Sequence, residues 1–366
     1  LVVGLAFLSR NDGVLLGLPF ALAFLYDLLR PPRLSRIGWW PAIACAAGFV
    51  LVASPWLLRQ LDVFGSISPS SAGGRILFIT EYRELYSVSS ETTLASFLGQ
   101  GWPSLIESRL MGLGQALVIF ATSPMLAILV PFLLVGGWIK RRSRDFAPWF
   151  IYTLSLFLFT AIVSAVHAPY GTFLHSAVAL LPHAYPLAIV GIGGVVAWIA
   201  ARRPNWDAPR ASRNIGFMFV AVFVVVSAFA TLKVSTAWGE ERDARAEVLA
   251  ALASEADPAD RVMSPDAGAY RYHGGWTGIV TPDDPLPVVE EALRLYDVRW
   301  LALEGDHITS FLWPVLNGET RPEWLSEPLV LVPPLPGDEG EEDEVPVPQA
   351  ALYAVCLELD DERCDA

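Results

Sequence analysis

Long apolar runs separated by basic loops constrain the fold of this chain more than any other feature. The arginines and lysines cluster at Arg30–Arg36, Lys140–Arg144 and Arg202–Arg213, between runs of apolar residues. Runs of roughly 20 apolar residues match a hydrocarbon core about 30 Å thick. Because loops rich in Arg and Lys stay cytoplasmic, we expect the other loops, and everything after Lys233, on the extracytoplasmic side.

The sequence predicts a polytopic α-helical membrane domain over residues 1–234, with a truncated first helix at Leu1–Leu8 and about six full spans. The first run is too short to cross a bilayer, so we expect the chain to lack an N-terminal portion. No signal peptide is visible at the start. The full spans are expected near residues 13–29, 38–57, 113–138, 147–166, 177–200 and 215–234.

Charge divides the chain at about Lys233. Hydrophobic residues make up 54% of the sequence and the mean hydropathy is +0.45, which is too apolar for a soluble chain of this length. Residues 235–366 hold 29 acidic and 8 basic residues, whereas the first 234 hold 9 and 17. The split indicates an integral protein of the plasma membrane with an acidic, hydrated outer domain. A salty habitat is a second explanation of the acidity, and both stay open.

Residues 235–366 read as a small extracytoplasmic α/β domain. Helical periodicity covers 240–256 and 287–296, and short apolar strands are expected at 261–264, 299–303, 329–332 and 351–357. The strand–helix–strand order predicts a partly parallel sheet. An acidic segment near 337–348 is expected to be a disordered loop. Cys356 and Cys364 could pair, or stay free.

A long outer loop, residues 58–112, joins two of the predicted spans. Within it, Leu94–Leu98 and Leu105–Leu113 are candidates for short helices at the membrane interface. The polar stretch around Glu81 and Tyr82 could line a sugar pocket or orient an acceptor, but such a stretch is more often only a solvated loop.

Two arginines lie where predicted helices leave the membrane on the outer side. Arg10 follows the first helix, and its guanidinium could bind a lipid phosphate in a bidentate way. A snorkelling arginine in a tight turn built by Asn11, Asp12 and Gly13 is the alternative. Arg59 follows Trp56 at a second exit, where an interfacial anchor competes with a phosphate-binding function.

A second outer segment carries histidine and aromatic residues. Its polar candidates are His167, Tyr170, Thr172, His175 and His183. Their spacing does not match a zinc site, so hydrogen bonding or proton transfer at a membrane-edge cavity fits better, with plain packing for His183. The sequence contains no phosphate-binding glycine loop and no nucleophile elbow, which leaves nucleotide-driven chemistry and nucleic-acid partners without support.

Two motifs resemble those of the GT-C membrane glycosyltransferases. Gly4-Leu5-Ala6-Phe7-Leu8-Ser9-Arg10, followed by Asp12-Gly13, resembles the turn after a first helix in that family. Ser54-Pro55-Trp56-Leu57-Leu58-Arg59, followed by Val63-Phe64-Gly65-Ser66, resembles a later helix exit. Similar families include the protein O-mannosyltransferases, the lipid A aminoarabinose transferase and the dolichyl-phosphate-mannose-protein mannosyltransferase-like set.

The resemblance implies transfer of a sugar, a hexose such as mannose, from a polyprenyl-phosphate donor to a protein, lipid or glycan acceptor. Arg10 takes the place of the family's phosphate-binding base, and Arg59 is similar to a second one. Gln60 replaces the usual Asn, and His175 replaces an Arg-Tyr lead-in. The catalytic carboxylate, which in the family can also hold a divalent metal, is expected upstream of Leu1. Glu81, Tyr82, Tyr170 and His175 are the candidates for the substrate pocket.

Two other function classes fit parts of the sequence. A transporter or flippase would need charged residues and broken helices within the membrane, whereas the spans here hold almost no ionisable residues. A non-catalytic envelope protein with a partner-binding outer domain is the third possibility. The polar groups gather on one side of the predicted membrane, which favours an enzyme that works at the interface.

Overall fold

The computed structural model describes residues 1–29, 39–65, 67, 78–163, 165–166, 171–203, 206–334 and 348–357. The chain forms two compact units. The first comprises Leu1–Thr80 and Thr92–Val225, and the second comprises Glu81–Glu91 and Val226–Ala366. A short segment of the long outer loop therefore belongs to the same unit as the C-terminal sheet.

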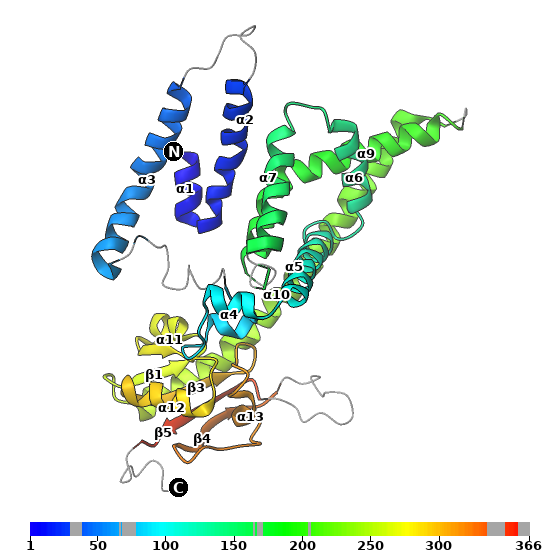
Figure 1. Cartoon of the computed structure of the whole chain (residues 1–366). Coiled ribbons are helices and arrows are strands. Elements are labelled where there is room, and N and C mark those ends of the chain that lie inside the picture. The colour runs from blue at the N-terminus through cyan, green and yellow to red at the C-terminus, as the bar shows by residue number, and fades with distance from the viewer. Residues whose placement is uncertain are drawn as a thin grey trace. The chain divides into compact units, whose positions relative to one another are not determined.

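The first unit is helical (Figure 1). Its elements are α1 (Val2–Ser9), the 3-10 helix η1 (Asn11–Leu16), α2 (Gly17–Leu29), α3 (Trp40–Phe64), α4 (Leu94–Gly99), α5 (Trp102–Thr122), α6 (Val130–Lys140), α7 (Ala147–Leu158), the π-helical turn η4 (Phe159–Val163), α8 (Thr172–Ser176), the 3-10 helix η5 (Ala177–Leu180), α9 (Leu181–Ala200) and the first part of α10 (Ala208–Glu255). The last helix continues without a break into the second unit.

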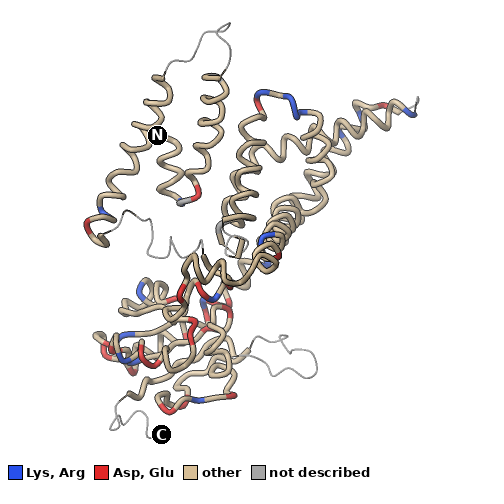
Figure 2. The backbone as a smooth tube through the Cα atoms, in the orientation of Figure 1, with Lys and Arg blue, Asp and Glu red and all other residues tan. Residues whose placement is uncertain are grey.

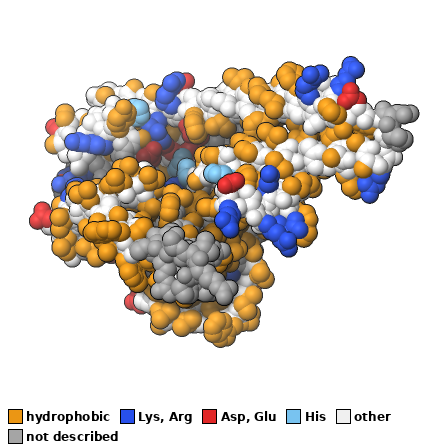
Figure 3. Space-filling view, turned by 90° about the horizontal axis from the view of Figure 1, so that it is seen from above, with side chains coloured by type: hydrophobic (Ala, Val, Ile, Leu, Met, Phe, Trp, Pro, Cys, Tyr) orange, Lys and Arg blue, Asp and Glu red, His pale blue; other side chains and the backbone are white. Residues whose placement is uncertain are grey.

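Four helical segments among the described residues are long and apolar enough to cross a membrane, by length and composition. They are Trp40–Phe64, Trp102–Thr122, Phe173–Ala200 and Ala208–Glu255. Hydrophobic side chains cover much of the surface visible in Figure 3. In Figure 2 the helices of the first unit carry few charges away from their ends, while charged residues are spread over the second unit. The apolar character predicted for residues 1–234 is therefore present in the helices.

The predicted span over residues 113–138 differs from the structure, which divides this segment into two helices. α5 ends at Thr122 and α6 begins at Val130. Between them, Leu126 and Ala127 have positive φ angles of 49° and 54°, so the backbone cannot continue as one right-handed helix. The predicted short helix Leu105–Leu113 is likewise part of α5, whereas the one predicted from Leu94 is confirmed as α4.

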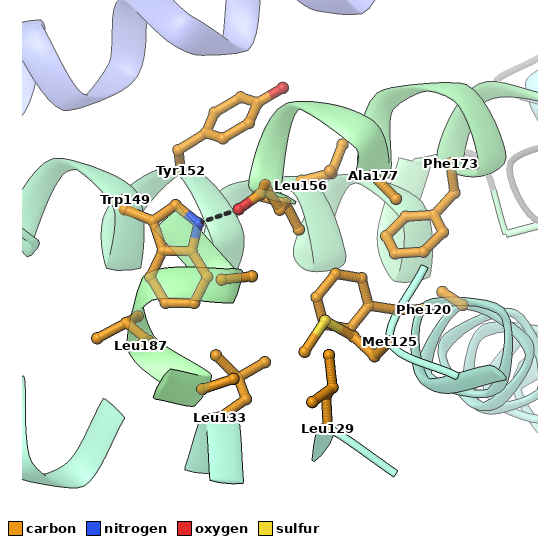
Figure 4. Close-up of a cluster of buried hydrophobic side chains, with 14 residues drawn as sticks. Phe120, Met125, Leu129, Leu133, Trp149, Tyr152, Leu156, Phe173, Ala177 and Leu187 are labelled. Atoms are coloured by element: carbon orange, nitrogen blue, oxygen red, sulfur yellow. Dashed lines mark hydrogen bonds between the residues drawn. The ribbon is translucent and has the colours of Figure 1, made fainter. Parts of the chain in front are cut away.

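A hydrophobic core joins α5, α6, α7, α8 and α9 (Figure 4). Phe120, Met125, Leu156 and Phe173 are buried together in it. The indole Nε1 of Trp149 donates a hydrogen bond of 2.9 Å to the carbonyl oxygen of Leu180, which satisfies its one polar atom inside the core. The core orients α8, which carries the histidine-bearing segment considered below.

Glycine lets α6 and α9 cross at close range. A Cβ built on Gly136 would lie 1.8 Å from the carbonyl oxygen of Leu187, and one built on Gly191 would lie 1.8 Å from that of Phe132. Small residues at such crossings let helix backbones touch, as is common for helices packed in membranes.

The second unit is built around a five-stranded sheet in the order β2-β1-β3-β5-β4. Strands β1, β2 and β3 are parallel, and β5 pairs antiparallel with both β3 and β4. The elements are η3 (Tyr82–Leu85), β1 (Arg261–Ser264), α11 (Ala267–Gly274), β2 (Thr277–Val280), α12 (Leu286–Leu295), β3 (Val298–Glu304), α13 (Trp313–Leu316), β4 (Leu325–Val332) and β5 (Ala350–Val355). The predicted partly parallel sheet is confirmed.

Helices cover both faces of this sheet. Val248 and Leu252 of α10 pack with Trp300 of β3 on one face. Val289 and Leu293 of α12 pack with Leu301 of β3 on the other. Alternate residues of β3 thus enter opposite cores, as expected for a strand buried on both sides.

The local predictions for this unit are mostly confirmed, with two omissions. Strand 261–264 matches β1, and the helix predicted at 287–296 matches α12 within one residue at each end. α11 and β2 were not predicted, because His273, Gly274 and Gly275 interrupt the apolar pattern there. Cys356 is disulfide-bonded. Cys364 and the acidic loop Gly337–Glu344 lie outside the described residues.

The glycine crossing predicts that Gly136→Ala destabilises the helical unit. The added methyl group would meet backbone rather than a movable side chain, so we expect a cost of about 1–3 kcal/mol. The matched control is Gly137→Ala, whose Cβ would only approach a ring carbon of Phe150 at 3.7 Å. Thermal unfolding of the two variants in detergent checks this; equal melting temperatures would contradict the close crossing.

Candidate functional site

Arg10 lies at the turn between α1 and η1. Its backbone is extended, with φ −163°, and ends the first helix. Its Nε lies 3.2 Å from Oδ1 of Asp12, and the Arg10 side chain is 37% exposed while that of Asp12 is 6% exposed. A Cβ on Gly13 would lie 2.3 Å from the carbonyl oxygen of Ala6, so the turn folds back closely on α1. The arginine is therefore held by a buried carboxylate with its other side open.

A second contact ties this turn to the histidine-bearing segment. The Oγ of Ser176, the last residue of α8, donates a hydrogen bond to Oδ2 of Asp12, and both residues are buried. His175, next to Ser176, is exposed. Asp12 thus joins two segments that are 164 residues apart in sequence. The structure brings Arg10, Asp12 and Ser176 into one polar network, which we call the Asp12 network, and the predicted residue His175 is the chain neighbour of Ser176.

The Asp12 network can bind an anion. Arg10 offers five N–H donors, and its Nε faces Asp12 in the ion pair described above. A guanidinium fixed on one side by a carboxylate and exposed on the other can present its remaining donors to a phosphate group. Because Ser176 holds the carboxylate in turn, Asp12 keeps its orientation without needing solvent.

The other residues predicted for the outer face of the membrane lie elsewhere. Arg59 is exposed near the C-terminal end of α3, with its guanidinium carbon 5.4 Å from the Trp56 ring centroid. This stacking fits an interfacial anchor. His183 contacts the ring of Phe146 edge-on at 6.0 Å, which agrees with packing. Tyr170 and His167 lie outside the described residues.

Glu81 and Tyr82 belong to the second unit, in the segment 81–91 that we call the docking strap. The Glu81 carboxylate accepts a hydrogen bond of 2.6 Å from Nε of Arg83. The hydroxyl groups of Tyr82 and Tyr86 are 3.4 Å apart. Both predicted residues are exposed, on η3 or next to it. They belong to a different unit from the Asp12 network.

The docking strap is bound by the Asp284 carboxylate and by the backbone N–H of Asp283, which donates to the carbonyl oxygen of Tyr86 at 3.2 Å. Asp284, which is 1% exposed and follows β2, accepts hydrogen bonds of 2.6 Å from both the Ser87 hydroxyl and the Val88 backbone N–H. The backbone N–H and the hydroxyl of Ser89 also donate to it. Burial alone would raise the pKa of Asp284, but the hydrogen bonds from Ser87, Ser89 and Val88 lower it below its usual value.

Sequence reasoning missed the three residues that organise these contacts. Asp12 was considered only as a turn-forming residue, and Ser176 and Asp284 were not singled out. A weak signal was present in the pair Asp283-Asp284, which lies between the predicted strand 261–264 and the predicted helix 287–296. Partners almost 200 residues away could not be found from it.

Removing the Asp284 carboxylate should release the docking strap. Asp284→Ala leaves the buried Ser87 hydroxyl without its acceptor, and we expect a loss of about 1–3 kcal/mol in the stability of the second unit. Limited trypsin digestion should then cleave faster after Arg83. The control is Asp243→Ala, an exposed aspartate whose ion pair is with the neighbouring Arg242. Unchanged cleavage in Asp284→Ala would show that the strap is held by other contacts.

Acid should have the same effect in the unmodified protein. Because the folded-state pKa of Asp284 is lowered, its contribution to stability is complete above the unfolded-state pKa of about 3.9 and is lost as the pH falls through the folded-state pKa. Cleavage after Arg83 by an acid-tolerant protease should therefore rise only below about pH 4.

The chain thus carries a cationic network in its helical unit and a separate polar strap on its α/β unit. The first presents a guanidinium fixed by a buried carboxylate. The second fixes a loop by multiple hydrogen bonds to one aspartate. No protein-family model, curated protein or solved structure matches the chain.

Proposed function

We propose that this protein is a membrane glycosyltransferase of the GT-C type that uses a polyprenyl-phosphate sugar as donor. The sugar is a hexose such as mannose, and the acceptor is an extracytoplasmic protein, lipid or glycan. The observation that carries this proposal is the Asp12 network, in which a buried carboxylate holds Arg10 at a turn between apolar helices. The same unit has helices long and apolar enough to cross a bilayer, and the hydrocarbon core of that bilayer would accommodate the lipid chain of the donor.

Arg10 binds the donor phosphate in this mechanism. As the bond between C1 of the sugar and the phosphate oxygen breaks, negative charge grows on the phosphate and an oxocarbenium-like centre forms at C1. A guanidinium in a water-poor site stabilises the departing charge. The acceptor hydroxyl attacks C1 and passes its proton to a carboxylate base, to which we assign no residue. To His175, which is exposed and follows Leu174 in α8, we assign a hydrogen bond to a substrate hydroxyl.

The ends of α6 and α9 support the proposed orientation. The guanidinium carbon of Arg141 lies 4.0 Å from the Trp138 ring centroid, and that of Arg202 lies 3.9 Å from the Trp198 ring centroid. Stacked Arg and Trp pairs suit the boundary between hydrocarbon and water. Since both pairs adjoin basic loops, these ends are assigned to the cytoplasmic side of the plasma membrane and the acidic second unit to the extracytoplasmic side.

Cysteine labelling tests this orientation. In a Cys45→Ser background, an impermeant maleimide added to intact cells should label Ala259→Cys but not Ala201→Cys. Both alanines are exposed in the structure, so accessibility of the two side chains is matched. Lysed cells should label both positions. Labelling of Ala201→Cys in intact cells would reverse the orientation and remove the phosphate-binding turn from the outer side.

Arg10→Ala should weaken binding of a polyprenyl phosphate by the full chain in nanodiscs. The lost charge-assisted contact is worth roughly 1.5–3 kcal/mol. This corresponds to an increase of about tenfold to a hundredfold in the dissociation constant. Arg10→Lys should recover part of the affinity, because lysine keeps the charge but loses the planar fork.

Arg202→Ala is the matched control for Arg10→Ala, because it also removes an arginine near a helix end but on the opposite predicted side. Its affinity for polyprenyl phosphate should equal that of the unmodified chain. Normal binding by a folded Arg10→Ala variant would make Arg10 a structural residue of the turn and would contradict the proposed function.

A further inference from the structure

Strands β1 and β3 are parallel neighbours in the sheet. The chain segment after β1 and the chain segment after β3 pack on opposite faces of the sheet. After β1 the chain enters α11, whose Tyr270 packs in the core beside α10. After β3 it continues to α13, whose Val315 and Leu316 pack in the core beside α12. In open α/β sheets, ligands bind in the crevice at the carboxyl ends of strands that diverge in this way.

Ionisable side chains gather at this position. Glu304, the last residue of β3, is 3% exposed, and Nε of Arg245 on α10 donates to its Oε1 at 2.9 Å, with a second hydrogen bond from Nη2 to Oε2. The same arginine lies 3.3 Å from Asp266, which follows β1. This fork fixes the Glu304 carboxylate, whose oxygens keep further lone pairs for another partner.

Two more ligand-type residues follow directly. The Asp306 carboxylate lies 2.6 Å from Nδ1 of His307. Three residues each offer one possible ligand atom here, namely Glu304, Asp306 and His307. These three atoms lie within 4.8 Å of one another, a spacing that a single ion can bridge. Glu241 on α10 also lies close to Asp306 and His307. Four carboxylates thus share this place with one guanidinium and one imidazole, which favours a cation as the missing partner over an anion.

Tyr270 gives an independent indication. Its side chain is fully buried, and its hydroxyl group makes no hydrogen bond that satisfies normal geometry. The Tyr270 hydroxyl lies close to the Glu304 carboxylate, on the side of the cluster. Buried polar atoms are rarely left unpaired, and a bound water or ion-bound water would satisfy this one.

We propose that Glu304, Asp306 and His307 bind a divalent transition-metal cation at the carboxyl ends of β1 and β3. Two carboxylates with one imidazole suit Mn²⁺ or Zn²⁺ better than Mg²⁺ or Ca²⁺, which prefer oxygen ligands alone. Arg245 orients the Glu304 carboxylate from behind, as outer partners of metal ligands commonly do. The site lies wholly in the second unit and does not depend on the proposed glycosyltransferase function.

Titration of the full, untagged chain in detergent with Mn²⁺ tests the site. The electron paramagnetic resonance signal of free Mn²⁺ falls when the ion is bound, so it measures affinity without an activity assay. We expect one saturable site, and we expect His307→Ala and Asp306→Asn each to weaken it by at least about tenfold. Mn²⁺ should also raise the melting temperature of the unmodified chain, because it binds the folded state.

His273→Ala is the matched control, since it removes another exposed histidine of the same unit, whose ring contacts Tyr272. It should bind Mn²⁺ like the unmodified chain. Asp306→Asn is nearly isosteric, so it keeps the test decisive if His307→Ala fails to fold. No saturable binding, or equal affinity in Asp306→Asn and the unmodified chain, would overturn the proposal.

Discussion

The helices of the first unit present more apolar surface than they can bury against one another. The most apolar stretch of α10 has no buried residue, and that of α3 has almost none. Such surface is unfavourable in water by roughly 25 cal/mol for each Å². The rest of the structure therefore depends on an apolar environment around these helices. This environment limits where polar groups can be placed.

Within that constraint, buried carboxylates organise the polar contacts. Asp12 holds Arg10 and Ser176, Asp284 holds the docking strap, and Glu304 holds Arg245. A buried charge is expensive unless it is paired and hydrogen-bonded, so each of these residues fixes its partners strongly. The proposed phosphate site and the proposed cation site each contain one of these buried carboxylates, Asp12 and Glu304 respectively.

Two of these carboxylates join segments that are distant in sequence. Ser87 and Asp284 are 197 residues apart, and Asp12 and Ser176 are 164 residues apart. The entropic cost of closing such loops rises only slowly with their length, so a few good hydrogen bonds and the packing around them can offset it. In the α/β unit, these hydrogen bonds hold the docking strap (residues 81–91) next to Asp284, which follows strand β2 of the sheet.

The sequence by itself determined which long segments are apolar and where four of the five strands of the sheet lie. Hydrophobic runs predicted α3, α9 and the apolar part of α10, and alternating strand and helix patterns predicted β1, α12 and a partly parallel sheet, because these features depend on local periodicity. It also singled out Arg10 and His175 as polar residues of interest.

Only the tertiary structure decided which polar residues meet. The break at Leu126 and Ala127 could not be read from an apolar run, since hydropathy does not report φ angles. The grouping of Glu304, Asp306 and His307 with Arg245 depends on the docking of α10 beside β3, and the assignment of Glu81 and Tyr82 to the α/β unit depends on Asp284. Such contacts are set by long-range packing, which local sequence patterns do not encode.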